Sequence, residues 1–307
     1  MRIKPLADGN YSRYNRITTF LIMFVNIKAM SLTPQPMPNE ENHPKVVHLR
    51  VLRPEFQETG SENQEARTDQ WHGLEPTTDL LKEVAQVSER MESASAHEIL
   101  RWSLDRFDNR FTMATAFGPE GMVLIHMLSE LDRPISIFNL ETGYQFPETL
   151  ELRDEVARRY GIEVELKKPE LSVEEYEAQN NGPVYKERPD QCCFDRKLRL
   201  LRPALDGKHA WASAIRRDQS PDRAQAPIVA WDEKFHLIKV SPLANWTRGQ
   251  VWKFITDNDI PYNPLHDQGY PSIGCQPCTR AILLGEDERA GRWSGFAKTE
   301  CGLHSRN

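Results

Sequence analysis

Five cysteines are the residues of this chain with the clearest capacity for chemistry. Two are adjacent, two form a Cys-x-x-Cys pair and one stands alone near a histidine: Cys192, Cys193, Cys275, Cys278 and Cys301. In a long chain, an odd number of cysteines in this arrangement is typical of metal binding or catalysis in a reducing compartment rather than of disulfides. We therefore expect a cytoplasmic protein whose thiols carry out its chemistry.

The first four cysteines have the donor number of a metal site. Four thiolates bind either a zinc ion or a [4Fe–4S] cluster. Structural zinc sites usually combine two Cys-x-x-Cys pairs, whereas the adjacent side chains of Cys192 and Cys193 diverge on a strand and lie about 100° apart on a helix. A cluster with separate iron corners accommodates such a pair better, so the spacing favours the cluster. A redox dithiol at Cys275 and Cys278 is a third alternative, although no thioredoxin-like sequence surrounds it.

The fifth cysteine, Cys301, lies between Glu300 and Gly302, three residues before His304. A thiol is nucleophilic as the thiolate, which a nearby positive charge such as a protonated His304 favours. Gly302 lets the backbone approach a substrate closely. A chain end is mobile unless it docks, so this thiol could meet two partners in turn. The alternative is an incidental cysteine at a frayed end.

Alternating strand and helix patterns predict the framework that positions these side chains. Strands are expected at 111–117, 135–140 and 162–166, with helices at 122–131 and 147–160 between them. Such alternation indicates an α/β fold with a parallel sheet, in which ligands bind at the carboxyl ends of the strands.

Two loops at that edge of the sheet contain candidate binding residues. The loop at 116–121 holds Phe117 and Gly118 before a helix whose free N–H groups can bind a phosphate. The loop at 140–144 offers Leu140 and Thr142 to a nucleoside. Each loop alone is also typical of a plain turn, but together they favour a nucleotide site.

The elements that follow can be predicted in the same way. A strand at 210–215 ends at Arg216, which could grip a phosphate or sulfate, and the alternative is a solvated charged loop. Residues 228–240 predict a β-hairpin, and residues 247–258 predict a helix.

Capping residues and apolar stripes predict where helices begin and which face they bury. A helical pattern begins at Thr77 with Leu81 on its apolar stripe, and Ser95 forms a capping box before the next helix. Thr247 is expected to cap the helix at 247–258, with Trp252 on its buried face.

The composition limits the class of protein. The 307 residues are 27% charged and 39% hydrophobic, and the net charge is −6. These values indicate a globular chain and argue against a general nucleic-acid binder, while they allow a local basic pocket for a small anion. The apolar run near the start is too short to span a membrane. We expect no nucleic-acid or membrane partner, and a homo-oligomer stays open.

Three segments are predicted along the chain. Residues 1–75 show no period and are expected to be a disordered or wrongly assigned leader, with translation beginning at Met30 or Met37. Residues 76–285 are expected to form the α/β domain that binds the nucleotide and the metal group. Residues 286–307 are expected to form a flexible tail that carries the catalytic cysteine.

Several motifs resemble those of one enzyme family. They are Leu-Glu-Thr-Gly-Tyr at 140–144, Cys-Cys at 192–193, Arg-Arg-Asp-Gln-Ser-Pro at 216–221, Tyr-Pro-Ser-Ile-Gly-Cys-Gln-Pro-Cys-Thr at 270–279 and Glu-Cys-Gly-Leu-His at 300–304. The combination spans about residues 90–305. It is similar to the iron–sulfur adenylyl-sulfate (APS) reductases among the assimilatory sulfonucleotide reductases.

The resemblance implies a PP-loop adenine-nucleotide hydrolase-like fold and a reaction in two steps. Cys301 would attack the sulfur of APS, release AMP and become an S-sulfocysteine, which thioredoxin or glutaredoxin would then reduce to release sulfite. It also implies a [4Fe–4S] cluster on Cys192, Cys193, Cys275 and Cys278. The implied substrate residues are Lys197, Arg289, Arg292 and His304 at the phosphosulfate, and Arg216, Phe117, Gly118, Leu140 and Thr142 at the AMP part.

The cationic residues among these fit the chemistry of the reaction. Attack on sulfur moves negative charge onto the leaving phosphate oxygens, and fixed cations stabilise that charge. Lys197 lies one helical turn after Cys193, a spacing that would place it between cluster and substrate. The alternative for Arg289 and Arg292 is a surface ion-pair cluster with the acidic residues 286–288.

Other functions are also to be weighed against the sequence. A 3′-phosphoadenylyl-sulfate (PAPS) reductase runs the same thiol chemistry, but the four cluster cysteines argue against it. A PP-loop ATP pyrophosphatase usually shows Ser-Gly-Gly-x-Asp-Ser, which residues 116–122 lack. A zinc-stabilised nucleotide-binding module would give Cys301 no role. Two departures from the reductase pattern, Glu141 in place of Asp and no serine before Phe117, concern only the nucleoside contacts.

Overall fold

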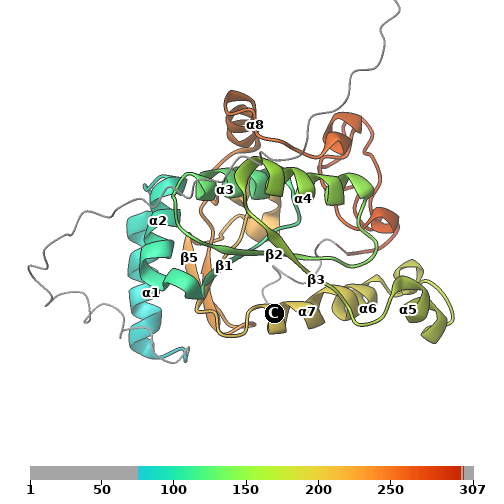
Figure 1. The fold of residues 1–307 in the computed structure, drawn as a ribbon, viewed down its shortest axis with the longest axis horizontal. Helices are drawn as coiled ribbons and strands as arrows, with labels where there is room; N and C mark the ends of the chain where they lie inside the picture. The colour runs from blue at the N-terminus through green and yellow to red at the C-terminus, as the bar shows by residue number, and fades with distance from the viewer. Residues whose placement is uncertain (1–74, 299, 301–307) are drawn as a thin grey trace, which may run out of the picture. The chain divides into compact units, whose positions relative to one another are not determined.

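A mostly parallel β-sheet organises the part of the chain that this computed structural model describes, residues 75–298 and 300. Within those residues the sheet has six strands, in spatial order β3 (Val164–Lys167), β2 (Ser136–Leu140), β1 (Phe111–Ala114), β4 (Ala210–Ala212), β6 (Leu237–Val240) and β5 (Val229–Asp232). All neighbouring strands are parallel except β5 and β6, which form the predicted antiparallel pair. The predicted α/β fold is therefore confirmed (Figure 1).

Successive strand residues contribute to two different cores. Ile137 and Ile238 lie in the larger core, whereas their neighbours Phe138 and Leu237 lie in a smaller one. Because successive side chains of a strand point to opposite faces, the sheet is buried on both sides. This explains why the central strands β1 and β4 are buried runs without an exposed polar face.

Helices cover both faces of the sheet. The larger core receives side chains from α1 (Thr78–Met91), α2 (Ala96–Phe107), α3 (Pro119–Ser129), α4 (Pro147–Tyr160) and α8 (Arg248–Asp257). The smaller core receives Leu201 from α7 (Arg199–Ala204). Figure 1 shows α3 and α4 on one side of the sheet and α7 on the other.

Short helical segments connect these elements. They are α5 (Val173–Gln179), α6 (Pro189–Cys193), a π-helical turn (Phe194–Leu198) and 3-10 turns at Asp108–Arg110, Val184–Lys186, Arg217–Gln219, Pro221–Arg223, Pro264–Gln268 and Gln276–Cys278. The cysteines of the first pair end α6, whereas Cys275 precedes the last 3-10 turn and Cys278 ends it.

The predicted caps are present. Glu98 donates its N–H to Ser95 Oγ at 3.2 Å, and Ser95 donates its N–H to Glu98 Oε2 at 2.7 Å, which completes the capping box. Thr247 caps α8 in the same way. Two side chains differ from expectation, because Leu81 is exposed and Trp252 is only partly buried.

β1 ends at Ala114 rather than at residue 117 because the chain turns there. Thr115 Oγ1 accepts a hydrogen bond from the N–H of Phe117 at 3.0 Å, and Phe117 has a φ of +55°. α3 then begins at Pro119, earlier than predicted. Proline suits a first helical position because its φ is fixed and its missing N–H would have had no helical partner.

The described residues all fall within one compact unit, residues 58–307. The predicted leader at 1–75 and the starts at Met30 and Met37 lie outside the described residues, apart from position 75. Among the described helices, none combines the length and the apolar character that crossing a bilayer requires.

Candidate active site and cysteine cavity

The carboxyl ends of β1, β2 and β4 meet at one pocket. The chain runs outward from β1 to β3 and then returns to β4 on the other side of β1, so the strand order reverses between β1 and β4. Open α/β sheets bind their ligands at such a switch point. Gly118 and Leu140, which the sequence placed at one edge of the sheet, both line this pocket.

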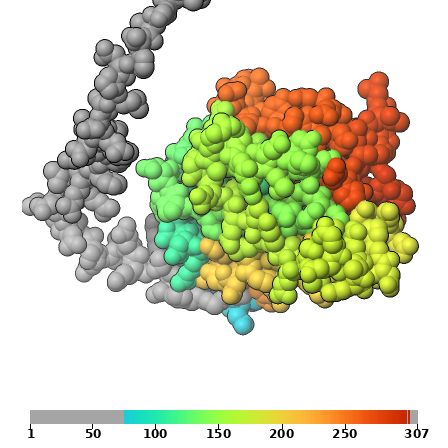
Figure 2. All heavy atoms as spheres, turned by 45° about the vertical axis from the view of Figure 1, so that its right-hand side comes forward, coloured from blue at the N-terminus to red at the C-terminus, as the bar shows by residue number. Residues whose placement is uncertain are grey.

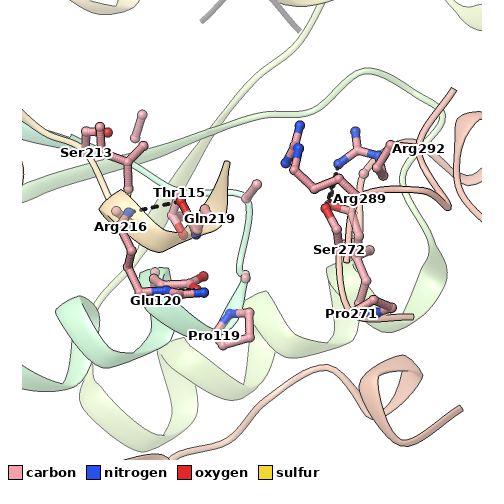
Figure 3. A pocket seen from close by; sticks show the side chains of 18 of the residues that line it. Thr115, Pro119, Glu120, Ser213, Arg216, Gln219, Pro271, Ser272, Arg289 and Arg292 are labelled. Atoms are coloured by element: carbon pink, nitrogen blue, oxygen red, sulfur yellow. Dashed lines mark hydrogen bonds and ion pairs between the residues drawn. The ribbon is translucent and has the colours of Figure 1, made fainter. Parts of the chain in front are cut away.

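Two walls face each other across the pocket in Figure 3. One comes from the loop after β1, the start of α3 and the segment after β4, and it includes Glu120 and Arg216. The other comes from the long C-terminal segment and includes Ser272, Arg289 and Arg292. Elements far apart in the sequence therefore form a loop wall and a basic wall on opposite sides of the pocket.

The loop wall is built by close backbone packing. Gly118 precedes Pro119 at the start of α3, whose first N–H groups have no partner within the helix. A Cβ on Gly121 would lie 2.9 Å from Thr115 Oγ1, so glycine permits the tight approach of α3 to the end of β1. Phe117, predicted to contact the substrate, instead places its side chain in the core and does not line the pocket.

Arg216 lines the pocket with a guanidinium that already has carboxylate partners. Its side chain is 2% exposed, and its Nε donates to Glu120 Oε1 at 2.7 Å. Asp218 pairs with its Nη1. Removing one partner of such a buried pair leaves an uncompensated charge, so Glu120 and Arg216 hold the start of α3 to the segment after β4.

The basic wall contains Arg289 and Arg292 but not the surface cluster that was the alternative. Glu286 pairs with Arg280 and Glu288 pairs with Arg248, whereas Arg289 pairs with Glu300 at 3.2 Å.

Arg292 is positioned by its own contacts in that wall. Its Nη1 donates to Ser272 Oγ at 3.4 Å and to the carbonyl of Ile273 at 3.3 Å, and its guanidinium lies 4.4 Å from the Trp293 ring centroid. The guanidinium therefore has a fixed place in the pocket.

All four paired cysteines line a second, smaller cavity beside the pocket. The N–H of Gln276 donates to the carbonyl of Tyr144 at 2.7 Å, so the Cys275–Cys278 turn is attached to the loop after β2. Figure 2 shows the C-terminal segment in orange and red packed beside the yellow segment that carries Cys192 and Cys193. The structure thus brings together the quartet predicted from the sequence.

Arg196, in the π-helical turn, attaches the cysteine helix to the loop after β2. It is buried and donates to the carbonyl of Thr142 and, at 3.2 Å, to that of Leu171. Gly143 has a φ of +80°, and a Cβ there would lie 3.0 Å from Arg196 Nη2. The glycine of the 140–144 motif is therefore needed for conformation and for space. π-turns are frequent at functional sites.

The pKa values of the thiols depend on burial and on the charges of their neighbours. Burial raises the pKa of Cys192 to about 12, and the other three thiols around it add to the shift. Burial also raises the pKa of Cys278, to about 11. Burial opposes ionisation of Cys275 as well, but Lys197, the Thr142 hydroxyl and Arg292 outweigh it and lower the pKa of that thiol.

The quartet has the donor number of a metal group that takes thiolates. Among residues 75–298 and 300, no group of three or more His, Cys, Asp or Glu side chains, the quartet included, is placed to hold a metal ion. A [4Fe–4S] cluster takes one thiolate at each of its four iron atoms, and it occupies more volume than a single metal ion. Four thiols line one cavity, and they match the donor set that such a cluster would bind.

The two cavities share a wall. Lys197, Cys275, Arg292 and Trp293 line both of them. Lys197 therefore lies between the thiol quartet and the pocket, the position that its spacing from Cys193 predicted. Thr142, predicted at the AMP part, lines the cysteine cavity instead, where its hydroxyl is 3.3 Å from Cys275 Sγ.

The predicted catalytic residues Cys301 and His304 lie outside the described residues. Their neighbour Glu300 is described and lines the pocket together with Arg223 and Gln219. None of these three residues was predicted from the sequence as a site residue. Glu300 beside a candidate nucleophile and Arg223 at the end of the charged run at 216–223 were the signals that could have found them.

Comparison with known proteins identifies the family. A model of the phosphoadenosine phosphosulfate reductase domain matches residues 110–281, more than half of the chain. The chain belongs to this family. The match includes every strand of the sheet and all four cysteines of the cavity, whereas the reductase domain model ends before Arg289 and Glu300.

This chain matches relatives in the reductase family over most of the length of each relative. Adenosine 5′-phosphosulfate reductase of Staphylococcus epidermidis is 46% identical over 214 residues, 69% of this chain and 88% of the relative. Adenosine 5′-phosphosulfate reductase 1 of Bacillus subtilis is 45% identical over 210 residues, 68% of this chain and 90% of the relative. The crystal structure of phosphoadenylyl-sulfate reductase from Candida auris, a phosphate complex, superposes with a TM-score of 0.59 at 29% identity, over 66% of this chain and 97% of that one.

Proposed function

We propose that this member of the reductase family reduces APS to sulfite and AMP in assimilatory sulfate reduction. Relatives named adenosine 5′-phosphosulfate reductase, 44–46% identical to this chain, support that substrate. The observation that carries the proposal is the shared wall, in which Lys197 and Arg292 face both the nucleotide pocket and the four thiols. A cationic wall between these two cavities suits a phosphosulfate anion.

The nucleotide would bind at the switch point of the sheet. The loop after β1 and the start of α3 offer backbone N–H groups to the phosphate, and Leu140 offers an apolar contact to the nucleoside. The sulfate end would then point to Lys197, Arg289 and Arg292. These cations would stabilise the negative charge that appears on the phosphate oxygens as AMP departs.

The proposed chemistry uses the thiol of Cys301 twice. Its thiolate attacks the sulfur of APS, an S–S bond forms, and AMP leaves with the electron pair of the broken S–O bond. A thioredoxin or glutaredoxin thiol then attacks the Cys301 sulfur, and sulfite leaves. The second thiol of the donor closes the donor disulfide and regenerates the Cys301 thiol, so that the donor supplies both electrons.

Cys192, Cys193, Cys275 and Cys278 would hold a [4Fe–4S] cluster in this proposal. With its four thiolates the bound cluster would carry a net charge of about −2, which Lys197 and Arg292 in the shared wall would balance. Lys197 and Arg292 would orient the phosphosulfate against that wall. Free thiols of this kind persist in the reducing cytoplasm, which is the compartment that we propose.

The substrate can be tested by comparing two nucleotides. We expect sulfite release with thioredoxin to have a kcat/KM at least about 10²-fold higher for APS than for PAPS, since a 3′-phosphate needs its own partners in a buried pocket. The measurement is the initial rate of sulfite formation at limiting nucleotide. A preference for PAPS would replace the proposal with the second candidate, which the Candida auris structure favours.

Substituting Gly274 with alanine is expected to displace Arg292. A Cβ on Gly274 would lie 2.1 Å from Arg292 Nη2 and 2.4 Å from its Cζ. The guanidinium is the end of a flexible side chain, so it should move while the backbone stays. We expect kcat/KM for APS to fall by about 10- to 100-fold, because a charge-assisted contact is lost, with the urea midpoint of unfolding unchanged.

Gly249→Ala is the matched control for this substitution. Gly249 lies in α8, and a Cβ there would meet nothing closer than 4.0 Å. The control should keep the kcat/KM of the unmodified chain. A Gly274→Ala protein with the same kcat/KM would show that Arg292 does not act on the substrate.

A further inference from the structure

Two arginines donate hydrogen bonds to the carboxylate of Glu300, which lines the pocket. Arg223 donates from Nε to Oε1 at 3.0 Å and from Nη2 to Oε2 at 2.9 Å. Arg289 donates from Nη2 to Oε2 at 3.2 Å. The Glu300 side chain is 9% exposed and that of Arg223 is 10% exposed. A bidentate pair in a largely dry place is the geometry in which arginine binds a carboxylate most strongly.

Arg223 also connects Glu300 to the segment after β4. Its Nη1 donates to Gln219 Oε1, and the same oxygen accepts the N–H of Arg216 at 3.0 Å. Arg216 is in turn bound to Glu120 at the start of α3. A continuous series of polar contacts therefore runs from the loop wall of the pocket to residue 300.

Lys298 provides a second contact of the same segment. Its Nζ pairs with Asp190 on α6 and lies 5.3 Å from the centroid of the Trp293 ring. The Lys298 side chain is 8% exposed. The segment therefore contacts the cysteine helix at residue 298 and the nucleotide pocket at residue 300.

We propose that Arg223 is a positioning residue that, through Glu300, holds the residue directly before Cys301 at the pocket. Consecutive Cα atoms are about 3.8 Å apart, so the anchoring of Glu300 limits the reach of Cys301. All three nitrogens of the Arg223 guanidinium are engaged by Glu300 and Gln219. Arg223 thus acts on the nucleophile and not on the substrate anion. The inference rests on the proposed function only in giving Cys301 its catalytic role.

The reactivity of the Cys301 thiol tests the contact without any turnover. The cofactor-containing full chain is treated with iodoacetamide over a range of pH, and modification of the C-terminal peptide is followed by mass spectrometry. Arg223→Met and Glu300→Gln should each raise the rate on the high-pH plateau roughly tenfold, the effect of losing a charge-assisted pair. The double variant should raise it no further, because the two residues act through one contact.

The pH profile distinguishes a change in the position of the Cys301 thiol from a change in its pKa. Loss of the Glu300 carboxylate should lower the pKa of the neighbouring thiol, whereas loss of the Arg223 guanidinium should raise it. The plateau rate, at which all thiols are ionised, should rise in both variants. Unchanged plateau rates in both would overturn the inference, whatever the substrate proves to be.

Steady-state rates provide the second readout. Arg223→Met should lower kcat for sulfite release about tenfold and leave the KM for APS unchanged, since the guanidinium nitrogens of Arg223 are engaged by Glu300 and Gln219 and not by the substrate. A raised KM with the same kcat would show that Arg223 binds the substrate directly, and the inference would fail.

Glu92→Gln is the matched control for both readouts. Arg217, in the same 3-10 turn as Gln219, pairs bidentately with Glu92 at 2.6 and 3.0 Å, away from the pocket lining. Loss of the Glu92 carboxylate should change neither the plateau rate of Cys301 modification nor the kcat for sulfite release.

Discussion

Replacing Cys301 with serine should reduce sulfite release by at least about 10³-fold while the chain still binds AMP. A serine hydroxyl is not ionised at neutral pH and is a much weaker nucleophile than a thiolate. The residues that line the nucleotide pocket are unchanged in the variant, so the affinity for AMP should stay the same. Sulfite formation and calorimetric titration with AMP measure the two quantities.

The covalent intermediate gives this prediction a direct check. Incubation with APS and no reductant should add the mass of one sulfo group to the C-terminal peptide of the unmodified chain and none to that of Cys301→Ser. A variant that releases sulfite at the normal rate would remove the thiol from the mechanism. The chain would then be closer to a nucleotide-binding module with a structural metal.

Replacing Cys275 with serine should remove the iron from the protein. We expect anaerobically purified chain to contain about four iron and four acid-labile sulfide per molecule, the content of one [4Fe–4S] cluster, and the variant to contain almost none. Cys275 is the thiol whose pKa is lowered by Lys197, Thr142 and Arg292 against the effect of burial. Its loss removes the thiol with the lowered pKa, and burial hinders the ionisation of two of the thiols that remain, Cys192 and Cys278.

Cys301→Ser is the matched control, because it makes the same chemical change at a cysteine outside the quartet. It should keep the iron, the sulfide and the brown colour of the unmodified chain. Zinc without sulfide in the unmodified chain would contradict the cluster and would remove the main reason to prefer APS over PAPS.

Much of the framework follows from local sequence. The apolar runs and capping residues predict the sheet and helices α1, α2, α4 and α8 because each pattern reports burial or a cap over a few residues. The end of β1 was placed too late because a hydrogen bond from Phe117 to Thr115 breaks an apolar run that continues in the sequence. The π-helical turn after Cys193 likewise leaves no sign in a helical pattern.

The residue types in the sequence predicted which side chains lie at the site, but not which atoms each side chain contacts. Motif position grouped Phe117 and Thr142 with the nucleotide contacts, yet one side chain turns into the core and the other towards Cys275. The direction of a side chain in a turn depends on the backbone angles and on neighbours distant in sequence. The pair of Arg223 and Glu300 joins residues from two such distant segments, so no local pattern could indicate it.

The position of the second cysteine pair has a consequence for how the molecule is made. All strands of the sheet lie before residue 241, whereas Cys275, Cys278 and the basic wall follow in a segment whose described part contains only 3-10 turns after α8. Chains emerge from the ribosome amino end first, and the earlier part can fold while the rest is still being synthesised. The sheet and its switch point can thus exist before half of the thiol ligands have been translated. Loading of the cysteine cavity should be a late step in biogenesis, and a ribosome stalled before residue 275 would carry a folded sheet that lacks two of the thiols needed to hold the metal group.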